Sequence, residues 1–202
     1  MSLRLVGTEP NIDFDGPRRV ERLLKHFRPD IIALDMDEER VALLLSETDE
    51  QKIARVLHEN PGANSETVKE FIRLNCYEYK TAKKYADERG IAVELVDAAY
   101  GSIPEIKITV LESMKKNYFL SVDEFQTQKK YRVEQRLLPA NLLLYVTQRD
   151  EKMAEQLRKL PASAKTLFFA PWGILYAEYN NLYKQLSDLT PYRMMLSEAD
   201  KY

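Results

Sequence analysis

The chain has 202 residues, of which 45% are hydrophobic and 31% are charged. This length predicts a single domain, residues 1–202, and the composition is too apolar for an intrinsically disordered protein. The 30 basic and 32 acidic residues leave a formal charge of −2, so the overall charge does not indicate nucleic-acid binding.

Cysteine usage and hydropathy both bear on where the protein works. Cys76 is the single cysteine and cannot form an intramolecular disulfide, which favours a reducing compartment. We expect it to be a buried structural residue within a helix. No stretch approaches 18 uninterrupted apolar residues, and the first residues do not resemble a signal peptide. The sequence therefore predicts a cytoplasmic protein without membrane insertion.

The first 34 residues follow the pattern of a strand, a helix and a second strand. Residues 3–8 alternate apolar and polar side chains, residues 17–27 place apolar side chains at helical spacing, and residues 31–34 form a short apolar run. Strands joined through a helix are normally parallel, and ligands in parallel sheets bind beyond the carboxyl ends of the strands. The polar side chains expected at that edge are Thr8, Glu9, Asp35 and Asp37.

The remainder of the chain continues the alternation of helix and strand. Residues 91–97 and 166–170 have the composition of strands, and a last short strand is expected at 193–196. The charged stretch 103–160 repeats apolar residues every three or four positions, which predicts a helical insertion between the third and fourth strands. The expected fold is an α/β domain with a mostly parallel sheet of four to five strands flanked by helices.

Three ordered blocks of sequence resemble the TraB/PrgY pheromone-shutdown family. The first runs from residues 5–8 through residues 28–37 to Arg40 and matches that family's strand end, acidic pair and arginine. The second covers residues 78–97, and the third, 148–154, is similar to the family's Glu-Arg-Asp helix. The resemblance implies the same α/β fold and a ligand site formed by Thr8, Arg40, Arg149 and Asp150.

The sequence departs from this family at the positions of its histidines. In the wider group that contains TraB and the Tiki proteases, two Gly-x-x-His strand ends are thought to supply metal ligands. Residues 7–10 here read Gly-Thr-Glu-Pro and residues 170–173 read Ala-Pro-Trp-Gly, so neither contains the imidazole that a catalytic metal commonly uses. His26 and His58 lie in amphipathic segments away from the strand ends. We expect no tightly bound transition metal and no cofactor.

The acidic residues at the strand ends leave two interpretations open. Glu9, Asp35 and Asp37 could converge to hold a hard cation such as magnesium, or serve as a general acid and base. Alternatively, these residues have structural roles, and Asp37 followed by two glutamates is well placed to cap a helix. We favour capping for Asp37 and leave both interpretations open for Asp35.

Arg149 and Asp150 follow an apolar run at 142–146 and could point a charged pair at the sheet. Such a pair could bind an anionic ligand, or it could fasten the helix to the sheet through an ion pair. In either case we expect Arg149 and Asp150 to act together with the acidic cluster around Asp35.

The tyrosines raise the question of a protein interface. Tyr176, Tyr179 and Tyr183 recur at helical spacing after the fourth predicted strand. Most of this stripe is expected in the core, but tyrosine suits interfaces, so part of it could form a homodimer contact.

Two classes of function remain. The preferred one is a non-catalytic binding or regulatory protein that recognises a peptide or small ligand. The alternative is an atypical metal-dependent or carboxylate-based hydrolase that uses Glu9, Asp35 and Asp37. No nucleophile elbow, Walker loop or dinucleotide-binding fingerprint occurs in the sequence.

Overall fold

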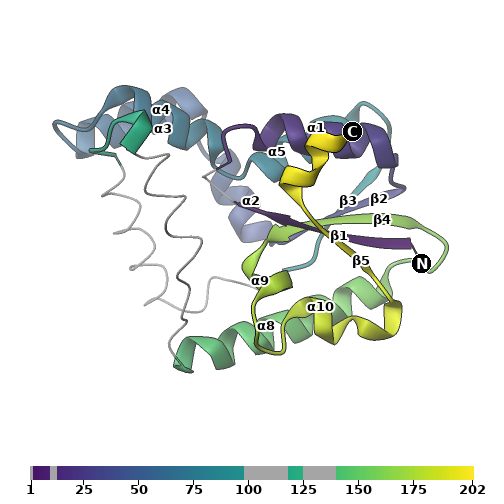
Figure 1. The fold of residues 1–202 in the computed structure, drawn as a ribbon. Helices are drawn as coiled ribbons and strands as arrows, with labels where there is room; N and C mark the ends of the chain where they lie inside the picture. The colour runs from purple at the N-terminus through teal and green to yellow at the C-terminus, as the bar shows by residue number, and fades with distance from the viewer. Residues whose placement is uncertain (1, 10–12, 98–117, 125–139) are drawn as a thin grey trace.

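The computed structural model describes residues 2–9, 13–97, 118–124 and 140–202, and in the last segment the side chains from residue 148 onward. Its centre is a sheet of five parallel strands in the order β3-β2-β4-β1-β5 (Figure 1). The strands are β1 (Ser2–Thr8), β2 (Ile31–Leu34), β3 (Ala92–Leu95), β4 (Lys165–Pro171) and β5 (Tyr192–Met195). The predicted α/β class with a parallel sheet is confirmed.

The carboxyl ends of four strands lie at one edge of the sheet, as predicted. Gly7 of β1 pairs with Ala170 of β4, and Leu34 of β2 pairs with Phe169 of β4 and with Leu95 of β3. We call this side the carboxyl edge and the opposite side, where the strands begin, the amino edge. Because β4 lies between β1 and β2, the first two strands of the chain do not touch each other.

Helices cover both faces of the sheet (Figure 1). On one face lie α1 (Gly16–Phe27), α5 (Tyr77–Asp87) and the C-terminal 3-10 helix η3 (Leu196–Lys201). The other face is covered by α8 (Ala140–Lys159), α9 (Gly173–Tyr176), α10 (Leu182–Gln185) and the short 3-10 helix η2 (Ser187–Leu189).

Strand periodicity divides the apolar side chains between two cores. Val6 and Phe169 belong to the core beneath α1 and α5, whereas their neighbours Leu5 and Phe168 belong to the core beneath α8 and α10. Successive side chains of a strand point to opposite faces, so strands covered on both faces are apolar throughout. This explains why β2 and most of β4 read as continuous apolar runs.

Three further helices connect β2 to α5. They are α2 (Glu38–Leu45), α3 (Asp49–Glu59) and α4 (Ser65–Leu74). Each begins at a side chain that accepts backbone N–H groups of the first turn: Asp37 for α2, Thr48 for α3 and Asn64 for α4. The α3–α4 pair packs around Val56, Val68 and Ile72, which form a small core separate from the two that cover the sheet.

Two local predictions are wrong. Cys76 does not lie within a helix: it occupies the turn between α4 and α5, half-buried, with a left-handed backbone (φ 52°). The tyrosine stripe is not helical throughout, because α9 ends at Tyr176 and α10 begins at Leu182. Asn181 caps α10 and donates to the carbonyl groups of Leu175 and Ala177, so the chain turns between the two short helices.

Much of the predicted helical insertion at 103–160 lies outside the described residues. The parts described are residues 118–124 and α8, and α8 is helical as expected. Within the described part of the chain, no helix is long and apolar enough to cross a membrane.

Candidate functional site

The ends of β2 and β3 bring two aspartates together at the carboxyl edge. Asp35 follows β2 directly, and its N–H donates to the carbonyl of Phe169 on β4 (3.1 Å). Asp97 follows β3, and its N–H donates to the carbonyl of Met36 (3.1 Å). Backbone hydrogen bonds therefore fix both positions just beyond the regular sheet.

Arg149 of α8 reaches these two aspartates from the face opposite α1 and α5. Its Nε donates to Asp97 Oδ1 and its Nη2 to Asp97 Oδ2, both at 2.8 Å, and Nη2 also contacts Asp35 Oδ1. All three residues are at most 9% exposed. This buried group, which we call the Arg149 cluster, confirms the expected contact between Arg149 and Asp35.

Arg40 of α2 extends the cluster toward solvent. Its Nη1 donates to Asp97 Oδ2 (3.1 Å) and to the backbone carbonyl of Asp35 (2.9 Å), while 36% of its side chain stays exposed. Two guanidinium groups thus face two carboxylates, and Arg40 is the member of the four that solvent reaches most.

The other predicted acidic residues do not join this group as a metal site. Asp37 caps α2, its Oδ1 accepting the N–H of Arg40 at 2.7 Å, which confirms the capping interpretation. Glu9 lies half-buried after β1, and its carbonyl accepts the N–H of Asp13 (3.2 Å). Among the residues that the structure describes, no group of three or more His, Cys, Asp and Glu side chains is placed to hold a metal ion.

Asp150 points away from the Arg149 cluster and toward the α9–α10 connection. Its Oδ2 accepts from the hydroxyl of Tyr179 (3.0 Å) and from the N–H of Leu182 (3.1 Å). The Oδ1 atom is buried without a hydrogen-bond partner among the described residues. Successive residues of a helix point about 100° apart, which separates the two neighbours on α8. Asp150 therefore ties α8 to the segment after β4.

Burial raises the pKa values of two carboxyl groups on this side of the molecule. Burial raises the pKa of Asp150 to about 7, and the Tyr179 hydrogen bond opposes this shift. It also raises the pKa of Asp35 to about 6, against the attraction of Arg149. Desolvation disfavours the charged form of an acid, whereas a nearby cation favours it. Because of the contact with Arg149, we take Asp35 to be ionised at neutral pH.

Glu78 is a site residue that the motifs alone did not single out. It lies in the first turn of α5, and burial raises its pKa to about 7, opposed by the neighbouring Thr8 hydroxyl at the end of β1. Thr8 itself is fully buried. The available signal is that Glu78 opens the second block of family resemblance. Glu78 is therefore, with Asp150, the second carboxyl group of this region whose pKa is raised to about 7.

The tyrosines of the broken stripe are engaged within the chain. The Arg193 guanidinium lies over the rings of Tyr176 and Tyr183, 4.2 and 4.0 Å from their centres. Tyr179 donates to Asp150 as described above. A homodimer contact through these residues stays a prediction.

No protein-family model, no curated protein and no solved structure matches this chain. The likeness to the TraB/PrgY family accordingly stays a prediction based on the three sequence blocks. The arrangement itself consists of a buried, charge-balanced cluster with one half-exposed arginine, and of two carboxyl groups, on Glu78 and Asp150, with pKa values near neutrality.

Proposed function

We propose that this chain is a divergent TraB/PrgY-like binding or regulatory protein that recognises an acidic group, on a small ligand or a peptide, at the carboxyl edge of its sheet. Arg40 is the contact residue, and Arg149 positions it through their shared partner Asp97. The observation that carries this proposal is the Arg149 cluster, buried at the strand ends with Arg40 half-exposed upon it.

The energetics of burial support a role beyond folding. Replacing a buried ion cluster by apolar side chains of similar volume is often neutral or stabilising, because removing charges from water costs about as much as their attraction returns. A sheet with two extensive apolar cores has no evident need of such a cluster for stability. Its position, beyond the carboxyl ends of parallel strands, is where α/β folds bind ligands.

The geometry of Arg40 suits recognition of an anion. Two hydrogen bonds to fixed acceptors hold its side chain, so less side-chain freedom is lost when a ligand binds. A guanidinium offers paired N–H groups that match the two oxygens of a carboxylate.

Two features argue for binding rather than catalysis. The family's histidines are absent from the sequence, and Asp35 and Asp37 are held by contacts within the chain, because Asp35 contacts Arg149 and Asp37 caps α2. A general base must approach the substrate within hydrogen-bond distance. Asp35 and Asp37 already use their carboxylates in contacts within the chain, so these two residues are poor candidates for that role.

Thermal shift with small acids and short acidic peptides tests the proposal. At least one ligand should raise the melting temperature of the native chain, and Arg40→Gln should abolish the shift because it removes the contacting charge. Arg55→Gln is the matched control, since Arg55 is an exposed arginine on α3 that is also ion-paired. A shift that survives in Arg40→Gln, or no shift with any acid or peptide, contradicts the proposal.

The second candidate function, a carboxylate-based hydrolase, is favoured by one observation. Glu78, with a pKa raised to about 7 by burial beside the Thr8 hydroxyl, has the protonation behaviour of a general acid or base. A fluorogenic peptide pool separates the two functions. Turnover that falls at least about 100-fold in Glu78→Gln supports the hydrolase, whereas ligand binding without turnover supports the binding protein.

A further inference from the structure

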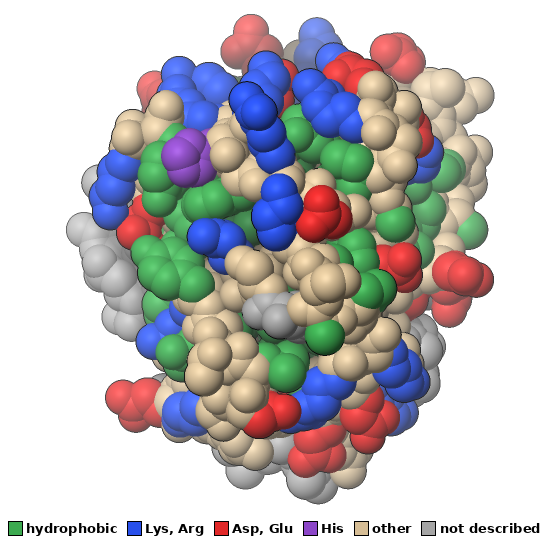
Figure 2. Space-filling model, turned by 90° about the vertical axis from the view of Figure 1, so that its right-hand side faces the viewer, with side chains coloured by type: hydrophobic (Ala, Val, Ile, Leu, Met, Phe, Trp, Pro, Cys, Tyr) green, Lys and Arg blue, Asp and Glu red, His purple; other side chains and the backbone are tan. Residues whose placement is uncertain are grey.

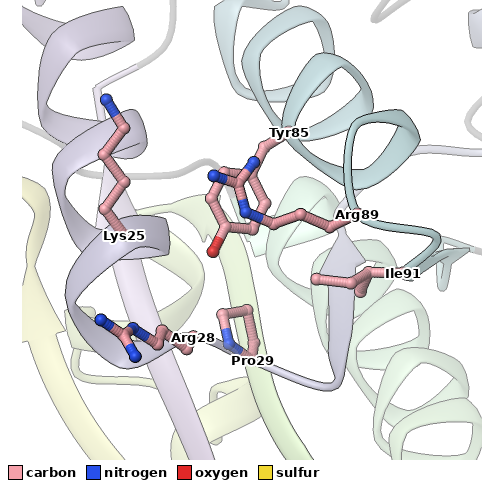
Figure 3. Close-up of a pocket in the computed structure, with 6 residues that line it drawn as sticks. All are labelled: Lys25, Arg28, Pro29, Tyr85, Arg89 and Ile91. Atoms are coloured by element: carbon pink, nitrogen blue, oxygen red, sulfur yellow. The ribbon is translucent and has the colours of Figure 1, made fainter.

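A pocket of about 480 Å³ lies at the amino edge of the sheet, on the side away from the Arg149 cluster. It opens where α1 and α5 end and where the chain enters β2 and β3 (Figure 3). Figure 2 faces this edge and shows Lys and Arg side chains gathered among apolar ones. The residues that line the pocket are Lys25, Arg28, Pro29, Tyr85, Arg89 and Ile91.

Three of the six lining side chains are cations, and they come from two distant segments. Lys25 and Arg28 lie on the α1 side, and Arg89 extends from the end of α5 across the ring of Tyr85 toward α1 (Figure 3). The Arg89 guanidinium lies 3.9 Å from the centre of that ring. Stacking holds the guanidinium plane while leaving its N–H groups at the edge for a ligand.

The ion pairs that Lys25 and Arg89 form with neighbouring glutamates are exposed to solvent and therefore weak. Lys25 pairs with Glu21 at 2.6 Å and Arg89 with Glu88 at 3.1 Å, but all four side chains are at least 40% exposed. Exposed pairs of this kind contribute little binding energy because water screens them, so a multivalent anion can displace them. Arg28 forms no side-chain hydrogen bond or ion pair with any residue that the structure describes.

The backbone of Arg28 is unusual for an arginine. It ends α1 in the left-handed conformation, with φ 45° and ψ 65°, a position that glycine most often occupies. For a residue with a Cβ atom this conformation is unfavourable, because the Cβ atom crowds the following carbonyl oxygen. A strained, exposed arginine without a partner points to a use for its side chain.

The floor of the pocket strengthens electrostatic attraction. Pro29 and Tyr85 are buried, and the Tyr85 hydroxyl donates to the carbonyl of Leu24 (2.9 Å). The apolar floor lowers the dielectric constant beneath the cations, which themselves stay in contact with solvent. The pKa of Glu21, which lies one turn before Lys25 on α1, is lowered first by its hydrogen bond to Lys25 and further by Lys84 and Arg89.

We propose that this pocket binds the phosphate group of a small ligand, with Arg28 and Arg89 donating to the phosphate oxygens and Lys25 adding a point charge. Two guanidinium groups and an ammonium line an open, apolar-floored pocket and carry the positive charge and the N–H donors that a phosphate group requires. The site is separate from the carboxyl edge and does not depend on the function proposed there.

Titration calorimetry at low salt with inorganic phosphate and with adenosine monophosphate tests this site. Both should bind the native chain, and Arg28→Gln should weaken binding about tenfold, the loss expected for one charge-assisted contact. Arg18→Gln is the matched control, because it removes the same charge from the other end of α1, where Arg18 is exposed. Arg40→Gln, at the carboxyl edge, should also bind both phosphates normally.

The relative affinities of phosphate and of the nucleotide identify which part of a ligand the pocket recognises. Tighter binding of the nucleotide than of phosphate supports an organic phosphate that also contacts the apolar floor, and equal binding supports recognition of the phosphate group alone. If neither ligand binds at about 5 mM, the proposed site is wrong, since a dissociation constant above this value corresponds to a binding free energy weaker than about 3 kcal/mol. An equal loss in Arg18→Gln also overturns it. If Arg28 only complements the carbonyl end of α1, Arg28→Gln lowers stability and leaves phosphate binding unchanged.

Discussion

The two edges of the sheet use arginine in opposite ways. At the carboxyl edge, Arg149 is buried and bonded to two carboxylates, and at the amino edge, Arg28 is exposed with no partner among the described side chains. The first guanidinium has been removed from water and depends on its partners, whereas the second keeps its hydration. Burial, more than the number of contacts, therefore decides what a charge contributes to stability.

The largest expected difference between the edges is in the free energy of unfolding. Arg149→Ala should destabilise the fold by about 3–5 kcal/mol because it leaves Asp35 and Asp97 buried without their cation. Arg28→Ala should change stability by less than about 0.5 kcal/mol. Urea denaturation of both variants measures this contrast, and similar losses would contradict it.

A double-mutant cycle assigns the loss to particular bonds. The cost of Arg149→Ala should shrink in an Asp35→Asn background, and shrink further in Asp97→Asn, because Arg149 makes two hydrogen bonds to Asp97. Additive free energies would show that these contacts do not couple.

A smaller effect is expected from the pH dependence of Asp150. Burial raises the folded-state pKa of this carboxyl to about 7, so the protonated form stabilises the fold. That contribution is complete below the unfolded-state pKa, near 4, and is lost as the pH rises toward 7. Asp150→Asn keeps an oxygen for Tyr179 and Leu182 and carries no charge.

Melting experiments at two pH values test this contribution. Asp150→Asn should resemble the native chain at pH 4 and be more stable at pH 8, by on the order of 2 kcal/mol. Glu155→Gln, a solvent-facing change on the same helix, serves as the control. If the native chain is at least as stable as Asp150→Asn at pH 8, the ionised Asp150 carboxylate does not destabilise the fold, and the prediction is wrong.

The smallest effect separates two aspartates that precede helices. Asp37 accepts an N–H of α2, whereas Asp15 precedes α1 without a side-chain capping bond. Asp37→Ala should therefore cost about 1 kcal/mol, and Asp15→Ala should cost less than about half of that. Thermal denaturation of the two variants gives the comparison, and equal losses would remove the distinction.

Local patterns account for what the sequence predicts well. The strand, helix and strand of the first 34 residues are predictable because apolar periodicity and prolines mark each element. The gathering of Thr8, Asp35 and Asp97 at one edge follows from parallel pairing alone. Capping by Asp37 is likewise visible in the residues that follow it.

Contacts between distant segments account for the rest. Arg149 lies 52 residues from Asp97 and 114 from Asp35, and no local pattern specifies which acid it meets. The different direction of Asp150 depends on the α9–α10 connection, where Asn181 interrupts an apparently helical repeat of tyrosines. The burial of Glu78 depends on how α5 meets the end of β1, which a single sequence does not show.

The position of β4 has a consequence for how the chain is made. Strands β1 and β2 leave the ribosome before β4, and the strand that joins them begins only at Lys165. About 130 residues separate the end of β2 from β4, and at translation rates of about 5–20 residues per second this corresponds to a wait of roughly 7–26 seconds. During that interval apolar strand edges stay unpaired on the nascent chain. Protection by chaperones should therefore matter most before β4 emerges.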